Sequence, residues 1–149
     1  PDGPMPEHYE PFESPTKNLL NDSVQAPCAL FTEDKDNRRG TTQDYPYVCT
    51  TYSVTEQWQT GAQTRSIPWL NELISCNFIE LSEELAKEKG IKNGDTVRVW
   101  NNRGMPHHFS WAGSFATGDN VNDLTPNVGD PVSFIPEYKA FLVNIEKAA

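Results

Sequence analysis

A polar segment in the middle of the chain carries the side chains best suited to bind a small ligand. Hydroxyl and carboxamide groups can hydrogen-bond the edge of a heterocycle, an arginine offers a forked cation for a phosphate, and a glycine lets the backbone approach closely. The residues concerned are Thr51, Tyr52, Glu56, Gln57, Trp58, Gln59, Thr60, Gly61 and Arg65. A solvated loop in which Trp58 and Trp69 serve only for packing explains the same pattern, and the residues alone leave both interpretations open.

Two later segments could contact such a ligand as well. Asn122 and Asp123 can pair with the edge of a base, although an ordinary turn before Pro126 is the simpler interpretation of that segment. Tyr138 and Lys139 stand at the start of the last predicted strand and could reach a phosphate or a ribose, but a lysine at a strand start is also an ordinary surface residue. Neither segment decides the function by itself.

The sequence offers little chemistry for a self-contained enzyme. His107 and His108 are adjacent, so in an extended segment their side chains point to opposite sides, and a single metal ion rarely binds both. Glu83 and Glu84 stand where a helix begins, and helix capping explains them. The three cysteines form no Cys-x-x-Cys pair, and no hydrolase or phosphate-binding motif occurs. We therefore predict that the chain supplies neither a catalytic residue nor a metal ligand.

Composition and charge exclude some classes of protein. The 149 residues include 36% hydrophobic and 22% charged side chains, which suits one folded domain. A net charge of -9 argues against a nucleic-acid-binding protein with a broad basic surface, although a local pocket can still hold an anion. No apolar run approaches the roughly 20 residues that span a bilayer. The chain begins at Pro1 rather than at a methionine, and we expect it to be part of a longer protein.

The elements that must position these side chains begin with an extended arm. Five prolines among residues 1–16 exclude a helix there, and the arm is either a linker or a segment that packs through its aromatic side chains. The polar stretch over residues 33–44 predicts an exposed loop. We therefore predict an entry arm and loop over residues 1–44 and a ligand-binding barrel domain over residues 45–149.

The middle of the chain predicts strands and one helix. Tyr45–Val54 is rich in Tyr, Val and Thr, which predicts a buried strand leading into the polar segment. Phe78–Leu81 predicts a short strand. Ser82 is a good N-cap for a helix that runs to about Lys89 and stops at Gly90.

The rest of the chain predicts strands and loops. A turn after Gly90 leads into a strand over Thr96–Trp100. Met105–Pro136 shows little periodicity and predicts a long loop region. Tyr138–Glu146 predicts a closing strand with one apolar face. Strands with long irregular connections favour a barrel, so the predicted fold class is mainly β, with one short α-helix and long loops.

Ten short segments share a pattern with one known family. They are residues 45–52, 55–61, 64–65, 68–73, 82–86, 90–91, 93–95, 101–104, 122–126 and 136–141. Together they resemble the last domain of formate dehydrogenase major subunits, in the molybdopterin oxidoreductase family, and the Pro-rich opening resembles the segment that enters that domain. No single segment would suffice, but the combination is specific and covers nearly the whole chain.

The resemblance implies a double-psi β-barrel that closes over bis(molybdopterin guanine dinucleotide) carrying molybdenum or tungsten. Members of the family oxidise formate to carbon dioxide and pass the electrons to iron–sulfur clusters. Their metal-binding, catalytic and cluster-binding residues lie in earlier domains, so this chain would bind the cofactor jointly with domains that it lacks. The implied partners are those remaining domains and an iron–sulfur subunit, with no nucleic acid and no membrane span. The implied location of the enzyme is the periplasm, with the cytoplasm as the alternative.

The resemblance also assigns parts of the cofactor to individual residues. The loop from Thr51 through Arg65 is implied to contact the pterin and a phosphate, and His107 and His108 are implied to lie near a pterin. The residues implied at the guanine-nucleotide end are Asn122, Tyr138 and Lys139.

Two departures from the family pattern bear on this assignment. Gln57 stands where many relatives have a histidine. Relatives insert further β structure after Gly104, and if those strands are missing here, the barrel stays incomplete, with unpaired edges. Two other functions remain as alternatives: a structural or interaction domain that has lost the cofactor, and a small hydrolase or metal enzyme.

Overall fold

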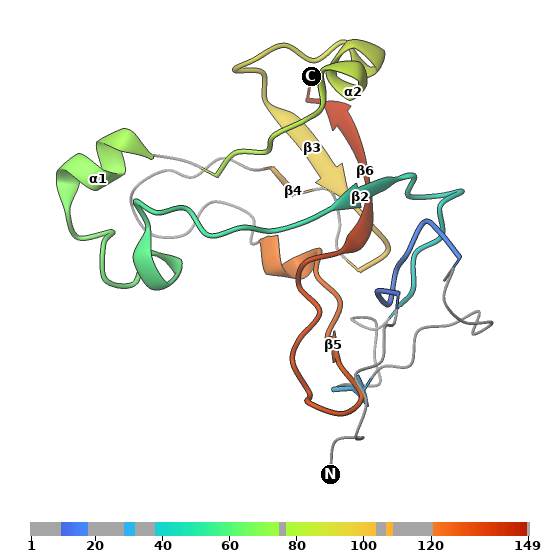
Figure 1. Ribbon diagram of the computed structural model, residues 1–149. Coiled ribbons are helices and arrows are strands. Elements are labelled where there is room, and N and C mark those ends of the chain that lie inside the picture. The colour runs from blue at the N-terminus through green and yellow to red at the C-terminus, as the bar shows by residue number, and fades with distance from the viewer. Residues whose placement is uncertain are drawn as a thin grey trace. The chain divides into compact units, whose positions relative to one another are not determined.

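The computed structural model resolves the chain into two units (Figure 1). The described residues are 10–17, 29–31, 38–74, 77–103, 107–108 and 121–148. Unit 1 contains the described parts of Pro1–Thr51, Trp100–Met105 and Val121–Asn144. Unit 2 contains the described parts of Tyr52–Val99, Pro106–Asn120 and Ile145–Ala149. Each unit thus combines segments that are distant in the sequence, and the predicted domain boundary after residue 44 stays a prediction.

The helix predicted after Ser82 is confirmed. Helix α2 spans Glu83–Lys89, and the backbone N–H of Leu85 donates to Oγ of Ser82 at 3.2 Å. Gly90 follows the helix with φ of 65°, a left-handed conformation that glycine adopts without steric cost. Local capping therefore fixes both ends of α2.

The main sheet has four strands in the order β2-β6-β3-β4. In chain order the strands are β2 Tyr47–Cys49, β3 Val97–Trp100, β4 His107–His108 and β6 Phe141–Lys147. In unit 1, β2 pairs antiparallel with the first half of β6, and in unit 2, β3 pairs antiparallel with β4. Figure 1 shows β6 as the longest strand, with β3 beside it.

Strand β6 carries much of the apolar core. Its residues Phe141, Leu142, Val143 and Ile145 are each at most 3% exposed. The sequence predicted one apolar face, but Leu142 belongs to the opposite face and is buried as well. The first half of β6 is therefore covered on both faces, which a pattern of simple alternation does not reveal.

A separate two-stranded sheet lies in unit 1. Strand β1, Ala29–Leu30, pairs antiparallel with β5, Val128–Gly129, and the N–H of Phe31 extends the pairing by donating to the carbonyl of Asn127 at 3.2 Å. A Cβ atom at Gly129 would lie 2.5 Å from Cζ of Phe31. The ring of Phe31 thus packs directly over a position that requires glycine.

Three predictions about the elements are wrong. The strand predicted over Tyr45–Val54 forms only at β2 and is not buried, because β2 has a single neighbouring strand and its middle residue is 50% exposed. Phe78–Leu81 forms no strand. A second α-helix, α1, spans Pro68–Leu73, with the proline at its start, where a missing N–H costs nothing. The described fold is therefore mixed, with an antiparallel sheet and a few short helices, rather than mainly β with one helix.

Unit 1 is held together by a buried ion pair between Glu13 and Arg103. The two side chains are 0% and 1% exposed, respectively. Both carboxylate oxygens of Glu13 accept from the two terminal nitrogens of Arg103, which is the forked geometry that carboxylates and guanidinium groups favour. Phe12, next to Glu13, is also buried, so the described part of the Pro-rich arm is a packed segment and not a free linker.

The polar atoms of this pair have further partners in the surrounding backbone. The carboxylate accepts the N–H groups of Gly40 and Leu142. The guanidinium donates to the carbonyl of Arg38 at 2.8 Å and twice to the carbonyl of Leu124, at 2.8 and 3.1 Å. Because both charges are fully hydrogen-bonded, the cost of removing them from water is offset, and the pair joins the arm to four other segments of unit 1.

Removing one member of the pair is expected to destabilise the protein strongly. Glu13→Gln leaves the charge of Arg103 buried without its counter-ion, so we expect the free energy of unfolding to fall by about 3–5 kcal/mol. The double variant Glu13→Gln, Arg103→Met should recover part of that loss, because no unpaired charge remains. Urea denaturation followed by tryptophan fluorescence measures both, and a loss below about 1 kcal/mol for the single variant would be that of a surface pair and would contradict this role.

Candidate functional site

Unit 1 contains a polar cavity of about 300 Å³. Its lining residues are Asn122, Asp123, Thr125, Pro126, Asn127 and Tyr138. Asn122 and Tyr138 are two of the residues that the sequence predicted for ligand binding, and the fold brings them to one cavity. Three of the other lining residues, Asp123, Thr125 and Pro126, belong to the turn that contains Asn122, and Asn127 directly follows that turn. The turn therefore forms much of the site.

One wall of the cavity is a short 3-10 helix, η3, at Val121–Asp123. The N–H of Leu124 donates to the carbonyl of Val121 at 3.0 Å, and Thr125 donates to the carbonyl of Asn122 through its N–H and its Oγ1, at 3.2 and 2.8 Å. Leu124 and Thr125 are buried, whereas Asn122 and Asp123 are exposed. The turn therefore buries its second half and presents an amide and a carboxylate from its first half.

The buried ion pair fixes this turn from within unit 1. The carbonyl of Leu124 accepts three hydrogen bonds, two from Arg103 and one from Nδ2 of Asn101 at 2.7 Å. Oδ1 of Asn101 in turn accepts the backbone N–H of Arg103 at 3.0 Å. Glu13, Asn101 and Arg103 were not predicted as site residues. Apart from the bond between Asn101 and Arg103, their partners in this network lie 21 to 129 positions away in the sequence.

Another part of the cavity is tied to Thr51. Its Oγ1 donates to the carbonyl of Tyr138 at 3.0 Å, and Nζ of Lys139 donates to the carbonyl and Oγ1 of Thr51 at 2.6 and 3.2 Å. Four predicted binding residues thus lie together in unit 1, with Asn122 as the fourth. The ammonium group of Lys139 is directed at Thr51, and Lys139 does not line the cavity.

The cavity is polar, but no cation lines it among the described residues. The amides of Asn122 and Asn127 can both donate and accept, and the carboxylate of Asp123 accepts only. A pyrophosphate would call for Arg, Lys or several converging N–H groups. This lining instead suits a flat, neutral heterocycle whose N–H groups can donate hydrogen bonds to the carboxylate of Asp123.

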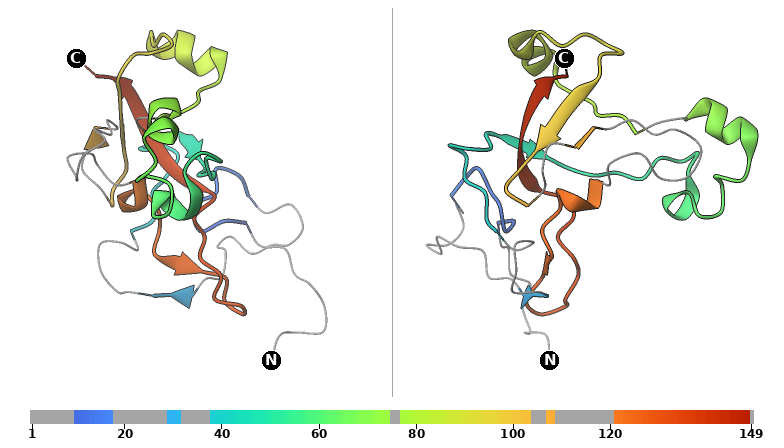
Figure 2. Two further views of the ribbon diagram at one scale, coloured as in Figure 1. Left: turned by 90° about the vertical axis from the view of Figure 1, so that its left-hand side faces the viewer. Right: turned by 180° about the vertical axis from the view of Figure 1, so that it is seen from behind.

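The predicted ligand loop of unit 2 is organised around Gln57. Its Nε2 donates to Oδ1 of Asn71 at 3.3 Å and to the carbonyl of Ile74 at 3.4 Å, and its Oε1 accepts from Oγ1 of Thr64 at 3.1 Å. The 3-10 helix η2, Trp58–Gly61, and helix α1 lie near each other at the end of this loop (Figure 2). Gln57 thus connects the loop to α1.

The aromatic side chains of the loop are exposed. Trp58 and Trp69 are 58% and 69% exposed, so packing in the core does not explain these two tryptophans. Tyr52 is also exposed, and its ring meets that of Phe78 edge-on at 6.1 Å. Partial desolvation raises the pKa of the Tyr52 hydroxyl, and a hydrogen bond to Glu80 and the charge of Glu80 raise it further. An exposed aromatic surface next to polar groups is the setting in which flat ligands or partner proteins bind.

Gly61 and Arg65 are matched to each other. Gly61 has φ of 80°, and a Cβ atom there would lie 2.4 Å from Nε of Arg65. The N–H of Arg65 donates to the carbonyl of Gly61 at 2.9 Å, and Nδ2 of Asn71 donates to the carbonyl of Arg65. Position 61 therefore requires glycine for two reasons: its backbone has a positive φ, and a Cβ atom would clash with the side chain of Arg65. The sequence had predicted a different role for this glycine, namely close approach of the backbone to a ligand.

The predicted site residues divide between the two units. Glu56 is half-buried and accepts from Oγ1 of Thr55 at 3.0 Å, within unit 2. The predicted residues whose side chains lie outside the described part are Gln59, Thr60, His107 and His108. A single site that combines the loop of unit 2 with the cavity of unit 1 stays a prediction.

Metal binding and membrane crossing find no support in the described residues. No group of three or more His, Cys, Asp and Glu side chains among them could hold a metal ion, and none of their helices is long and apolar enough to cross a membrane. Cys49 has a free thiol, and burial raises its pKa, which keeps a thiol protonated and unreactive.

Comparison with known proteins finds related sequences. Residues 47–107 match the family model described as molydopterin dinucleotide binding domain. The chain is 42% identical to formate dehydrogenase subunit alpha of Megalodesulfovibrio gigas and 40% identical to the formate dehydrogenase, nitrate-inducible, major subunit of Escherichia coli strain K12, in each case over 99% of the chain. It is 34% identical to the F420-dependent formate dehydrogenase subunit alpha of Methanocaldococcus jannaschii over 88% of the chain.

The chain spans only a part of these relatives. It covers 17% of the length of the first two and 25% of the third. The first two alignments extend over 179 and 176 residues, whereas the chain has 149, so within the aligned region each of these relatives carries roughly 30 residues without a counterpart here. This supports the expectation that the chain is shorter than its relatives, and the location of the difference after Gly104 stays a prediction.

Gln57→Ala is expected to loosen α1 without unfolding unit 2. The substitution removes three side-chain hydrogen bonds, each worth about 0.5–1.5 kcal/mol, so amide hydrogen exchange over Pro68–Leu73 should accelerate roughly tenfold or more. Gln63→Ala, at an exposed glutamine of the same loop, is the matched control and should leave exchange unchanged. Equal exchange of α1 in both variants, measured by mass spectrometry, would show that Gln57 does not hold the helix.

Proposed function

Because the chain contains a molydopterin dinucleotide binding domain and is homologous to part of formate dehydrogenase alpha subunits, we propose that it binds bis(molybdopterin guanine dinucleotide) in such an enzyme. The observation that carries this proposal is the cavity of unit 1, which unites Asn122 and Tyr138 beside Asp123. The activity of the complete enzyme is part of the proposal, since the chain spans a small share of the relatives' length.

The lining of the cavity fits the guanine end of the dinucleotide. Guanine presents two adjacent donors, a ring N–H and an amino group, and the two oxygens of a carboxylate such as Asp123 can accept both. Its carbonyl oxygen is an acceptor that an amide of Asn122 or Asn127 can serve. The ring of Tyr138 offers a flat surface for stacking against a base. The absence of a lining cation among the described residues fits a base better than a phosphate.

In this proposal, the loop of unit 2 binds the phosphate and pterin parts of the cofactor. Arg65 is exposed at the end of a loop that Gln57 and Asn71 hold together, and its guanidinium suits a phosphate oxygen pair. Trp58 and Tyr52 expose flat rings in the same unit, and such rings can stack on a pterin. His107 and His108 are proposed near a pterin on the family resemblance.

The chain's own contribution is binding and orientation. The metal of the bound cofactor, molybdenum or tungsten, supplies the redox chemistry by which formate becomes carbon dioxide, a proton and two electrons. The residues of this chain hold the guanine end, neutralise phosphate charge and exclude water from that part of the cofactor. We further propose that the remaining domains of the catalytic subunit and an iron–sulfur subunit are its partners, and that the enzyme is periplasmic.

The fold of the domain is proposed to be a double-psi β-barrel, which stays incomplete if the strands predicted to be missing after Gly104 are absent. The antiparallel pairing of β2 with β6 and of β3 with β4 is compatible with a barrel of short strands. A structure of the full-length subunit that lacks the barrel would overturn this part of the proposal.

Substitutions at two of the proposed binding residues, one in the cavity of unit 1 and one in the loop of unit 2, are expected to speed the release of the cofactor from the full-length subunit. Asn122→Ala removes a hydrogen-bonding group worth about 1 kcal/mol, so release should accelerate roughly fivefold. Arg65→Met removes a charged group at the phosphate, and a tenfold or larger effect is expected from a charge-assisted bond of about 1.5–3 kcal/mol.

Release can be followed through the fluorescence of the oxidised pterin and the liberated guanine nucleotide. Asn93→Ala, at an exposed position in the turn after α2, is the control and should release the cofactor at the wild-type rate. Wild-type release from both the Asn122 and the Arg65 variant would favour the alternative of an interaction domain without cofactor.

The isolated 149-residue chain is expected to show no oxidation of formate. It lacks the domains that would carry the metal ligand and the catalytic residues, and it would enclose the cofactor on one side only. The assay is formate-dependent reduction of a viologen dye by the purified chain, with and without added cofactor. Turnover above the rate of a denatured sample would contradict the assignment of this chain to binding alone.

A further inference from the structure

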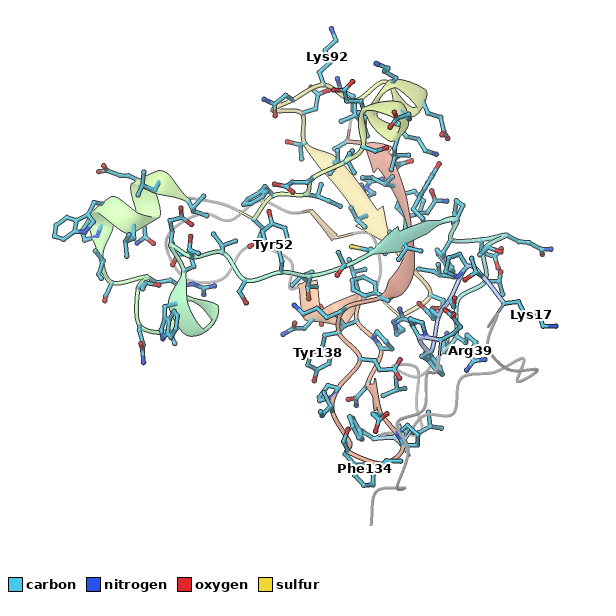
Figure 3. All side chains as sticks on the ribbon, in the orientation of Figure 1. Lys17, Arg39, Tyr52, Lys92, Phe134 and Tyr138 are labelled. Atoms are coloured by element: carbon cyan, nitrogen blue, oxygen red, sulfur yellow. The ribbon has the colours of Figure 1, made fainter. Side chains whose placement is uncertain are left out.

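The end of unit 1 that carries the two-stranded sheet exposes a group of apolar side chains. We call this group the apolar tip and define it as Leu30, Phe31, Val132, Phe134 and Ile135, which are 40–65% exposed. The pairing of β1 with β5 and the contact of Phe31 with Gly129 bring the two segments together. Figure 3 shows Phe134 at the end of the hairpin, with Tyr138 farther along the same segment.

The loop that presents the apolar tip is rigidly built around Asp130. Its carboxylate accepts the N–H groups of Val132 and Ser133 at 3.0 and 2.7 Å and Oγ of Ser133 at 2.9 Å. Its backbone carbonyl accepts the N–H of Phe134 at 2.9 Å, and its own N–H donates to the carbonyl of Ile135 at 2.9 Å. The bonds from Ser133 and Val132 lower the pKa of the Asp130 carboxyl, so its charge is used within the loop.

Phe134 has a backbone conformation that bulky residues rarely adopt. Its φ is 57°, and among the described residues it is the one residue other than glycine with positive φ. Asn or Gly would adopt this conformation with less strain, and at 62% exposure the phenyl ring gains little from its own chain. A bulky apolar residue held in a strained conformation at an exposed tip indicates that its side chain is used in contact with something else.

We propose that the apolar tip docks onto an apolar surface of the remaining domains of the same catalytic polypeptide. This inference rests on the proposed function, because the relatives carry about five-sixths of their length outside the region that this chain spans. Docking within one polypeptide is favoured because the partner surface is always present at high effective concentration.

The chemistry of the apolar tip defines that surface. The tip carries no Lys, Arg or Glu, and the one acidic group of the loop, Asp130, is bonded to the loop itself. Among the described residues that form the tip, a charged partner surface would find no counter-charge and an anionic membrane surface would find no cation. An uncharged apolar surface is the partner that the tip fits.

A photo-crosslinker tests the docking directly. In the full-length subunit, Phe134 is replaced by p-benzoylphenylalanine, and the crosslinked peptides are identified after irradiation. The proposal predicts a crosslink from position 134 to a segment of the same polypeptide outside this domain. The same replacement at Val48, an apolar residue that is 50% exposed on β2, is the control for exposure alone. Crosslinks only to a second copy, only to another protein, or to nothing would overturn the proposal.

Phe134→Asn gives a second test, in which a docked tip and a free tip predict opposite changes in the rate of amide hydrogen exchange. Asn relieves the backbone strain, so a free tip should show unchanged or slower amide hydrogen exchange over residues 128–138 of the full-length subunit. A docked tip loses its anchor and should exchange at least about fivefold faster. Ile135→Thr should also speed exchange over residues 128–138 if the tip is docked. Val48→Thr is the control and should leave that exchange unchanged. Cofactor content is measured in the wild-type subunit and in each variant. Normal content together with unchanged or slower exchange in Phe134→Asn refutes only this inference, whereas a wild-type subunit without cofactor refutes the proposed function.

Discussion

The buried contact between Glu13 and Arg103 is the constraint on which unit 1 depends. Neither residue lies in a helix or strand, and 90 positions separate them. Charges removed from water are costly unless each is paired and hydrogen-bonded, and here both carboxylate oxygens and all five guanidinium N–H groups have partners. The contact is therefore favourable in one arrangement of the surrounding loops only, so it specifies that arrangement in a fold whose short strands leave much of the backbone irregular.

The same network links the stability of unit 1 to its binding surface. The carbonyl of Leu124 receives three of the network's hydrogen bonds, and Leu124 directly follows Asn122 and Asp123 in the same turn. If the turn binds the ligand as proposed, it is held in position before the ligand arrives, which lowers the entropy lost on binding. The residues proposed to contact the ligand and the residues that fix their geometry are thus different sets, joined through one carbonyl group.

Some of this could be predicted from the sequence because its causes are local. Ser82 and Gly90 lie at the two ends of α2, and both signals are short-range. Strand lengths were harder to predict from the sequence. Strand β2 is short and half-exposed because it has only one neighbouring strand, and the number of neighbours is set by the tertiary structure. Pro68 was an available signal for α1 that was not used. The ion pair of Glu13 could not be predicted, since its partners are distant in the sequence. Asn122 and Tyr138 were predicted from side-chain chemistry and a family resemblance, and the fold places both at one cavity.

The central claim is that Arg103 acts on the cofactor by positioning Asn122. A double-mutant cycle on the rate of cofactor release from the full-length subunit tests it most directly, with Arg103→Lys, which cannot reproduce the five-donor fork, and Asn122→Ala. The account predicts that each single variant releases the cofactor faster and that the double variant is no faster than the faster single one. Fully additive effects, or an Arg103→Lys variant that releases the cofactor at the wild-type rate, would contradict it.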